Sequence, residues 1–191
     1  MTPANDPREP PVDFVDLILQ AHESLKGADL PHAFGGALAL AWCVGEPRAT
    51  NDIDVNVFVP AAQFRQVLAT LPSEIEASPR ALAQLERDGQ ARLWWNRVPF
   101  DVFLTSDPFH EAVADRIVLR EFAGRSVPFL ACVDLAVFKA FFDRSKDWQD
   151  IEEMVNAEAV ALPVLEGELI ELLGEDDQRV IRLRSLNRQR G

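Results

Sequence analysis

Apolar and polar residues alternate between positions 52 and 59, where the sequence reads DIDVNVFV. The odd-numbered positions are all Ile or Val, so they predict the buried face of a β-strand. Asp52, Asp54 and Asn56 then share the opposite face. Two carboxylates this close repel one another and lose hydration, so we expect a group nearby that compensates their charge.

Hydrophobic periodicity and turn residues predict the other elements. A helical stripe runs over 12–26 and is closed by Gly27, and Gly35-Gly36 connects a short strand at 31–34 to a small-residue helix at 37–44. Asn96-Arg97 and Gly124 each predict the turn of a hairpin. Hairpin strands are expected at 91–95 with 98–104 and at 116–122 with 126–131, and helices at 61–71, 80–86, 133–142, 148–156 and after residue 163. This order favours an α/β or α+β core with helices appended.

Length and composition are those of one globular domain with a helical extension. The chain has 191 residues, of which 48% are hydrophobic and 26% charged. We expect a flexible lead-in at 1–11, a core at 12–131 and a helical region at 132–191 that packs on the core. The polar, Pro-rich start lacks the features of a signal peptide, and no apolar run would span a bilayer, so we expect no membrane contact.

Cysteine content and net charge bear on the cellular location of the protein and on its binding of nucleic acid. Cys43 and Cys132 both have apolar neighbours, so we expect them to be core residues outside any disulfide framework, in a protein of the cytoplasm. A net charge of −12 argues against broad, non-specific binding of nucleic acid. Acidic residues at 166–177 precede five arginines at 178–191, a pattern typical of one helix matching its dipole; an arginine tail that touches RNA is the alternative.

A third acid strengthens the case for a site. Asp101 lies in the predicted strand VPFDVFL, where packing gives no reason for a charge. Three carboxylates from two neighbouring strands would form an oxygen-rich site for Mg²⁺, whose charge would neutralise their repulsion. Two such ions roughly 3.5–4 Å apart are a common clamp for displacement at phosphorus. The glycines at 35 and 36 would let a phosphate approach the amides at the start of a helix.

These motifs together resemble the nucleotidyltransferase fold of the polymerase-beta superfamily, a small mixed sheet flanked by helices. More narrowly, GGALALAWCVGEPRATNDIDV is similar to the AbiEii-type toxin nucleotidyltransferases and their relatives. Their motif has a Gly-Gly turn, a small-residue helix and Arg-x-Thr-x-Asp-Ile-Asp, which Arg48, Thr50, Asp52 and Asp54 match. A downstream segment of that family, a helix with a lysine followed by Arg-x-Lys-Asp and a further Asp, is matched by Lys139, Arg144, Lys146, Asp147 and Asp150.

The resemblance implies a function and a set of roles. The protein would be a metal-dependent transferase that moves a nucleoside monophosphate from a nucleoside triphosphate to a hydroxyl of tRNA or protein, and as a toxin it would have an antitoxin partner. Mg²⁺ or Mn²⁺, two ions in all, would be held by Asp52, Asp54 and Asp101, which are also the catalytic residues. The nucleotide would contact Gly35, Gly36, Arg48, Thr50, Lys139, Lys146, Asp147 and Asp150.

Simpler interpretations stay open for several of these residues. Taken without the resemblance, Lys139 would reach solvent from an apolar helix, Asp147 would cap a helix, and Thr50 would cap the turn before the strand. Two other functions also remain: a catalytically silent nucleotide-binding or regulatory module of the same fold, and a glycosyltransferase, which also uses Asp-x-Asp to bind a metal and a sugar nucleotide.

Overall fold

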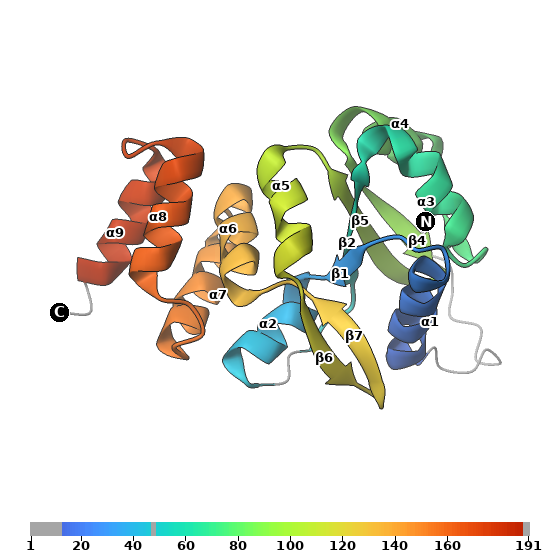
Figure 1. The fold of residues 1–191 in the computed structure, drawn as a ribbon, viewed down its shortest axis with the longest axis horizontal. Coiled ribbons are helices and arrows are strands. Elements are labelled where there is room, and N and C mark those ends of the chain that lie inside the picture. The colour runs from blue at the N-terminus through green and yellow to red at the C-terminus, as the bar shows by residue number, and fades with distance from the viewer. Residues whose placement is uncertain (1–12, 47–48, 189–191) are drawn as a thin grey trace.

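A seven-stranded mixed sheet organises the chain. The computed structural model describes residues 13–46 and 49–188, and the sheet has the order β3-β4-β5-β2-β1-β7-β6 (Figure 1). Its strands are β1 (His32–Phe34), β2 (Ile53–Pro60), β3 (Ile75–Glu76), β4 (Gln90–Trp95), β5 (Val98–Thr105), β6 (Val118–Phe122) and β7 (Arg125–Phe129). The helices are α1 (Phe14–Gly27), α2 (Gly36–Val44), α3 (Phe64–Thr70), α4 (Pro79–Asp88), α5 (Pro108–Val113), α6 (Cys132–Phe142), α7 (Ser145–Asn156), α8 (Leu162–Leu173) and α9 (Gln178–Arg188), with 3-10 turns at Ala61–Gln63 and Ala114–Arg116. The expected α/β class with a mixed sheet is confirmed.

The register of the central strands decides which side chains meet. Strands β2 and β5 run parallel, with Asp54 paired to Asp101, and β4 runs antiparallel to β5, with Arg92 paired to Asp101. Paired residues point to the same face of a sheet. Three charged side chains from three adjacent strands therefore share one face.

The alternation in β2 produces the two faces that the sequence predicts. Ile53, Val55 and Val57 are fully buried, while Asp54 on the other face is only partly covered. Burying such branched side chains on one face of a strand contributes roughly 1.5–3 kcal/mol each. The face that carries Asp54 is therefore set by burial of the opposite face.

Two short elements were not expected. Helix α5 begins at Pro108, and the carboxylate of Asp107 accepts a hydrogen bond from the His110 amide at 2.9 Å. The Asp-Pro pair is a helix start signal, but six residues are too few to show helical periodicity. Strand β3 has two residues and lies at the sheet edge, so alternation cannot reveal it.

The C-terminal region contains two helices where the charge pattern predicted one. Helices α8 and α9 stand together at one end of the molecule (Figure 1). Arg184 of α9 pairs with Glu166 of α8 at 2.7 Å, and Arg182 lies 3.3 Å from Asp143, which follows α6. The acidic and basic stretches thus face each other across a helical hairpin, and the single-helix interpretation is wrong. Residues 1–12 and 189–191, including the expected lead-in, lie outside the described residues.

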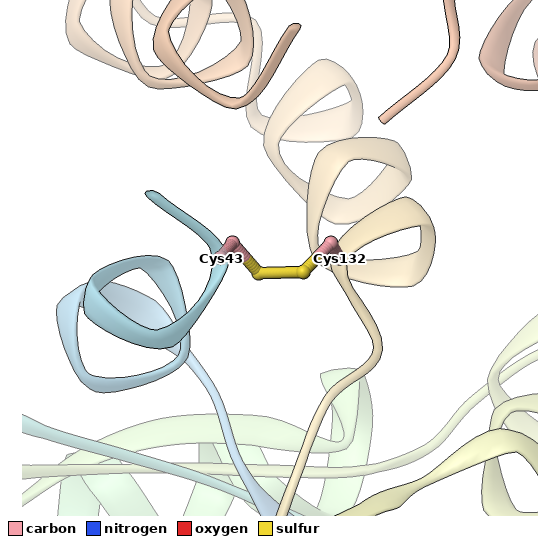
Figure 2. The surroundings of a disulfide bond; sticks show 2 residues. All are labelled: Cys43 and Cys132. Atoms are coloured by element: carbon pink, nitrogen blue, oxygen red, sulfur yellow. A yellow bond between two sulfur atoms is a disulfide. The ribbon is translucent and has the colours of Figure 1, made fainter. Parts of the chain in front are cut away.

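The prediction of two unpaired cysteines is also wrong. Cys43 near the end of α2 and Cys132 at the start of α6 form a disulfide, as Figure 2 shows, with their Cα atoms 5.7 Å apart. Apolar neighbours reflect helix packing here, since α2 lies against α6, and that packing brings the two thiols together. The cytoplasmic location was inferred partly from unpaired cysteines. It stays a prediction, and the cysteines no longer support it. No helix in the described part of the chain is long and apolar enough to cross a membrane.

A buried histidine pair ties α1 to β1. His32 Nδ1 donates to the Leu30 carbonyl oxygen at 2.8 Å, which leaves its Nε2 to accept from His22 Nδ1 at 2.9 Å. Both residues are at least 95% buried, and the hydrogen bond between them requires a neutral His32, because a protonated Nε2 cannot accept. Burial lowers the pKa of His32 from 6.5 to about 4.

Acidification should therefore destabilise the protein before most carboxylates titrate. Because the pKa of His32 is lower in the folded chain, the unfolded chain binds a proton first as pH falls below 6.5, and folding stability falls with it. Between pH 7 and pH 5 we expect a loss of about 2 kcal/mol from this residue. Urea unfolding across that range measures it. His32→Gln should flatten the slope whatever its effect on stability at pH 7, and an unchanged slope would assign the loss to other groups.

Candidate active site

The glycine turn lies directly against the second aspartate. The amide of Gly35 donates to the Asp54 carbonyl oxygen at 2.9 Å, and Gly36 starts α2 with a φ of +54°. A Cβ atom at Gly36 would lie 1.9 Å from Oδ2 of Asp54. Only glycine leaves room for the carboxylate to stand over the N-terminus of α2, where free amides favour negative charge.

Gly36→Ala should damage the site more than the fold. The methyl group would push the Asp54 carboxylate aside, and the positive φ adds roughly 1–2 kcal/mol of backbone strain. We expect a fall of at least tenfold in any activity that depends on Asp54, with a stability loss of a few kcal/mol at most. Thermal unfolding and an activity assay, run together, measure both. Gly45→Ala is the matched control, because Gly45 also has a positive φ but has open space around its Cβ position; equal losses in both variants would mean that strain alone acts.

The three predicted carboxylates come together at this turn. Burial, followed by the negative charges of Asp52 and Asp101, raises the pKa of the Asp54 carboxyl to about 6, while Lys139 and Arg92 act in the opposite direction. The carboxylates are thus close enough to repel one another, as the strand pattern predicted.

Arg92 is the compensating group nearest these acids, and the sequence did not reveal it. Its Nε and Nη2 donate to the two oxygens of Asp101 at 2.8 and 2.6 Å, and Nη2 also lies 3.5 Å from Oδ2 of Asp52. Such a two-point contact of guanidinium with carboxylate is among the stronger ion pairs. The hairpin predicted around Asn96-Arg97 contains Arg92, and the register from that turn places it opposite Asp101.

Thr50 supports the first aspartate. Its hydroxyl lies 2.8 Å from the Oδ1 atom of Asp52 and 3.1 Å from the carbonyl oxygen of the same residue. A hydroxyl that donates to a carboxylate oxygen fixes the side-chain direction. Thr50 thus orients Asp52 at the start of β2. Arg48, expected beside it, lies outside the described residues.

Lys139 lies inside the protein and is held there. The side chain is 9% exposed, and Nζ donates to Oδ2 of Asp150 at 2.6 Å and lies 3.8 Å from Asp147. The interpretation that this lysine reaches solvent is wrong, because α7 covers it and supplies its partners. Its charge still lowers the pKa of the Asp54 carboxyl, so α6 places a cation within electrostatic reach of the three acids.

The start of α7 forms a second charged cluster. Arg144 is the N-cap, and the carboxylate of Asp147, at the third helical position, accepts from its amide at 3.3 Å and from its Nε at 2.6 Å. Asp147 is therefore not the N-cap: from the third helical position its carboxylate accepts from the N-cap amide, which is one half of a capping box, and the Arg144 guanidinium cannot supply the other half because it has no acceptor. The nearby acids Asp54 and Asp101 contribute to a raised pKa of Arg144, after its bond to Asp147. Lys146 is exposed at the same helix end.

The donor chemistry of the site suits a hard divalent cation. Three carboxylates offer oxygen ligands, and the charges of Asp52 and Asp101 act against ionisation of the Asp54 carboxyl. As they stand, however, no three His, Cys, Asp or Glu side chains within 13–46 and 49–186 are grouped so that they could hold one metal ion. Asp101 instead has both oxygens engaged by Arg92. The residue types are those that bind such an ion. For Asp101 to bind it, Arg92 would have to release at least one carboxylate oxygen or share it with the ion.

The fold is similar to that of solved nucleotidyltransferase structures. An antigenic nucleotidyltransferase-like protein from Paracoccidioides brasiliensis matches with a TM-score of 0.53 at 16% identity, over 92% of this chain and 87% of that one. The antibiotic-resistance factor ANT(2'')-Ia matches with a TM-score of 0.53 at 18% identity, over 92% and 91%. Its complex with adenylyl-2''-tobramycin gives a TM-score of 0.53 at 15% identity, over 90% and 97%. At such identities the likeness establishes the fold, and this fold class was expected.

Sequence comparison adds no closer relationship. No family model matches the chain, and no curated protein matches it. The similarity to AbiEii-type enzymes therefore stays a prediction that rests on the motifs alone.

Proposed function

We propose that this protein is a metal-dependent nucleotidyltransferase, which transfers a nucleoside monophosphate from a nucleoside triphosphate to an acceptor hydroxyl. The observation that carries the proposal is the contact between the Gly35-Gly36 turn and Asp54, with Asp101 in register on the parallel neighbouring strand. A fold shared with nucleotidyltransferases supports it. In this proposal the core, expected at 12–131, carries the acids, and α6 of the C-terminal helical region contributes the charge of Lys139.

Each residue has a defined task in the proposed reaction. The amides after Gly35 cradle the triphosphate at the start of α2, where the helix dipole favours anions. Lys139 adds positive charge from inside the protein while Asp147 and Asp150 hold it in place. Thr50 and Lys146 contact the nucleotide, a role that the family motif also implies for Arg48, and Thr50 fixes the direction of Asp52.

The chemical step is a displacement at the α-phosphorus. The acceptor oxygen forms a bond to that phosphorus, the bond to the β-phosphate oxygen breaks, pyrophosphate leaves, and the hydroxyl proton passes to the carboxylate of Asp101. Mg²⁺ or Mn²⁺, two ions held by Asp52, Asp54 and Asp101, would supply the charge that neutralises the phosphates. The residues themselves contribute position and electrostatic stabilisation.

The acceptor belongs to one of three classes. The resemblance to toxin enzymes favours tRNA or a protein, and an antitoxin partner would then control the activity. The adenylyl-tobramycin bound to the similarly folded ANT(2'')-Ia adds a small-molecule hydroxyl as a third class. The net charge of −12 makes a cationic acceptor attractive on electrostatic grounds.

A labelling experiment tests the proposal. The protein is incubated with each α-labelled nucleoside triphosphate, Mg²⁺ or Mn²⁺, and in turn total tRNA, cell protein or tobramycin. We expect label on one acceptor class, absent with Asp52→Asn/Asp54→Asn. Nucleotide binding without label on any acceptor would favour the silent nucleotide-binding module, and hydrolysis of sugar nucleotides alone would favour a glycosyltransferase.

A further inference from the structure

Arg92 occupies a position that a simple surface ion pair does not explain. It lies on β4 directly opposite Asp101, and its side chain is half exposed while that of Asp101 is 16% exposed. Its guanidinium contacts both oxygens of Asp101 and reaches Oδ2 of Asp52. One cation thus bridges two of the three carboxylates that would have to bind a metal.

This bridge accounts for the arrangement of the acids. The guanidinium fork engages both oxygens of Asp101 and lies 3.5 Å from Oδ2 of Asp52, and among the described residues the three acids are not grouped as a metal site. A guanidinium keeps its proton at every physiological pH, so its charge leaves the acids only when the side chain moves. Movement is accessible because the side chain is half exposed, so water can solvate the guanidinium once it leaves the acids.

We propose that Arg92 is an exchangeable counter-ion: it holds Asp101 and Asp52 in the absence of a divalent cation and competes with that cation for their oxygens. Arg92 is therefore a positioning residue that acts through Asp101. The inference rests on the proposed function only in taking the three acids as the cation site. It assigns to Arg92 the stabilisation of an otherwise repulsive cluster, at the cost of weaker cation affinity.

Binding of Mn²⁺ to the full-length protein, measured by electron paramagnetic resonance without nucleotide or acceptor, tests this directly. Arg92→Gln should bind Mn²⁺ about tenfold more tightly, because both the competing contacts and a nearby positive charge are removed. Arg92→Lys keeps the charge but lacks the fork, and we expect an increase of about threefold. A residue that merely supported the site would give weaker binding in both variants.

A double-mutant cycle separates competition at Asp101 from the general electric field. In an Asp101→Asn background, Arg92→Gln should raise Mn²⁺ affinity by no more than about threefold, because the contested oxygens have lost their charge. An undiminished tenfold gain there, weaker binding in Arg92→Gln, or no Mn²⁺ binding in any variant would each overturn the inference. Circular dichroism of every variant confirms folding.

The titration is independent of the transfer reaction. If no acceptor is ever labelled but Arg92→Gln tightens Mn²⁺ binding, the proposed function fails and the counter-ion remains. If label is transferred but Mn²⁺ affinity falls in Arg92→Gln, the proposed function stands and the counter-ion inference fails.

Discussion

Asp54→Asn is expected to reduce nucleotidyl transfer by about a thousandfold or more while leaving the protein folded. The carboxylate stands over the glycine turn and between two further acids, so it is the central ligand of the proposed cation site. Removing a single preorganised electrostatic group from an active site commonly costs 10²–10³ in rate, and a central metal ligand should cost at least as much. Initial rates of label transfer, compared at equal protein concentration, measure the loss.

The same substitution should not lower stability, and this makes the result specific. Asparagine has the shape of aspartate without its charge, so the repulsion from Asp52 and Asp101 is relieved. A gain of about 1 kcal/mol would raise Tm by roughly 2–4 °C. Glu152→Gln at an exposed position in the middle of α7 is the matched control and should change neither property. Retention of more than a tenth of the activity by Asp54→Asn would remove Asp54 from the catalytic set.

Loss of the disulfide is expected to produce the largest change in stability. The bridge between Cys43 and Cys132 spans 89 residues, and a cross-link over a loop of that length restricts the unfolded chain by about 4–5 kcal/mol. Cys43→Ala/Cys132→Ala should therefore unfold at a Tm lower by roughly 10–20 °C. Thermal and urea unfolding of the oxidised protein and the variant measure the difference.

Reduction provides the control for this prediction. A dithiol reductant should bring the natural protein to nearly the stability of the double variant and leave the variant itself unchanged. If the oxidised protein and the variant unfolded together, the bridge would add nothing to folding stability. If the variant changed on reduction, the effect would lie outside the cysteine pair.

The strand pattern predicted the acids because their positions follow from period-two alternation. Asp52 and Asp54 had to share a face once the odd positions were buried, and Asp101 stood out as a charge in an apolar strand. Arg92 carried no such signal, since an arginine at an exposed position of a hairpin strand is ordinary. Its importance comes from cross-strand register, which the two-residue turn at Asn96-Arg97 determines, and counting outward from that turn would have placed it opposite Asp101.

Contacts between elements that are distant in the sequence could not be predicted from local sequence patterns. The two cysteines have apolar neighbours in sequence whether or not they pair, and only the packing of α2 on α6 decides that they meet. The same holds for His22 and His32, which share no motif yet hydrogen-bond across α1 and β1. Burial of Lys139 depends likewise on α7, whose acids lie beyond its own helix.

The disulfide also gives the covalent chain a particular shape. The segment between Cys43 and Cys132 is closed into a covalent ring by the disulfide. This ring contains Asp52, Asp54, Arg92 and Asp101, while Lys139 belongs to the segment that follows it. A protease that cuts one peptide bond within that ring leaves two polypeptides joined by the disulfide and releases no fragment. The nicked protein keeps its acids, its arginine and its lysine on one molecule, and only a second cut or a reductant can separate them.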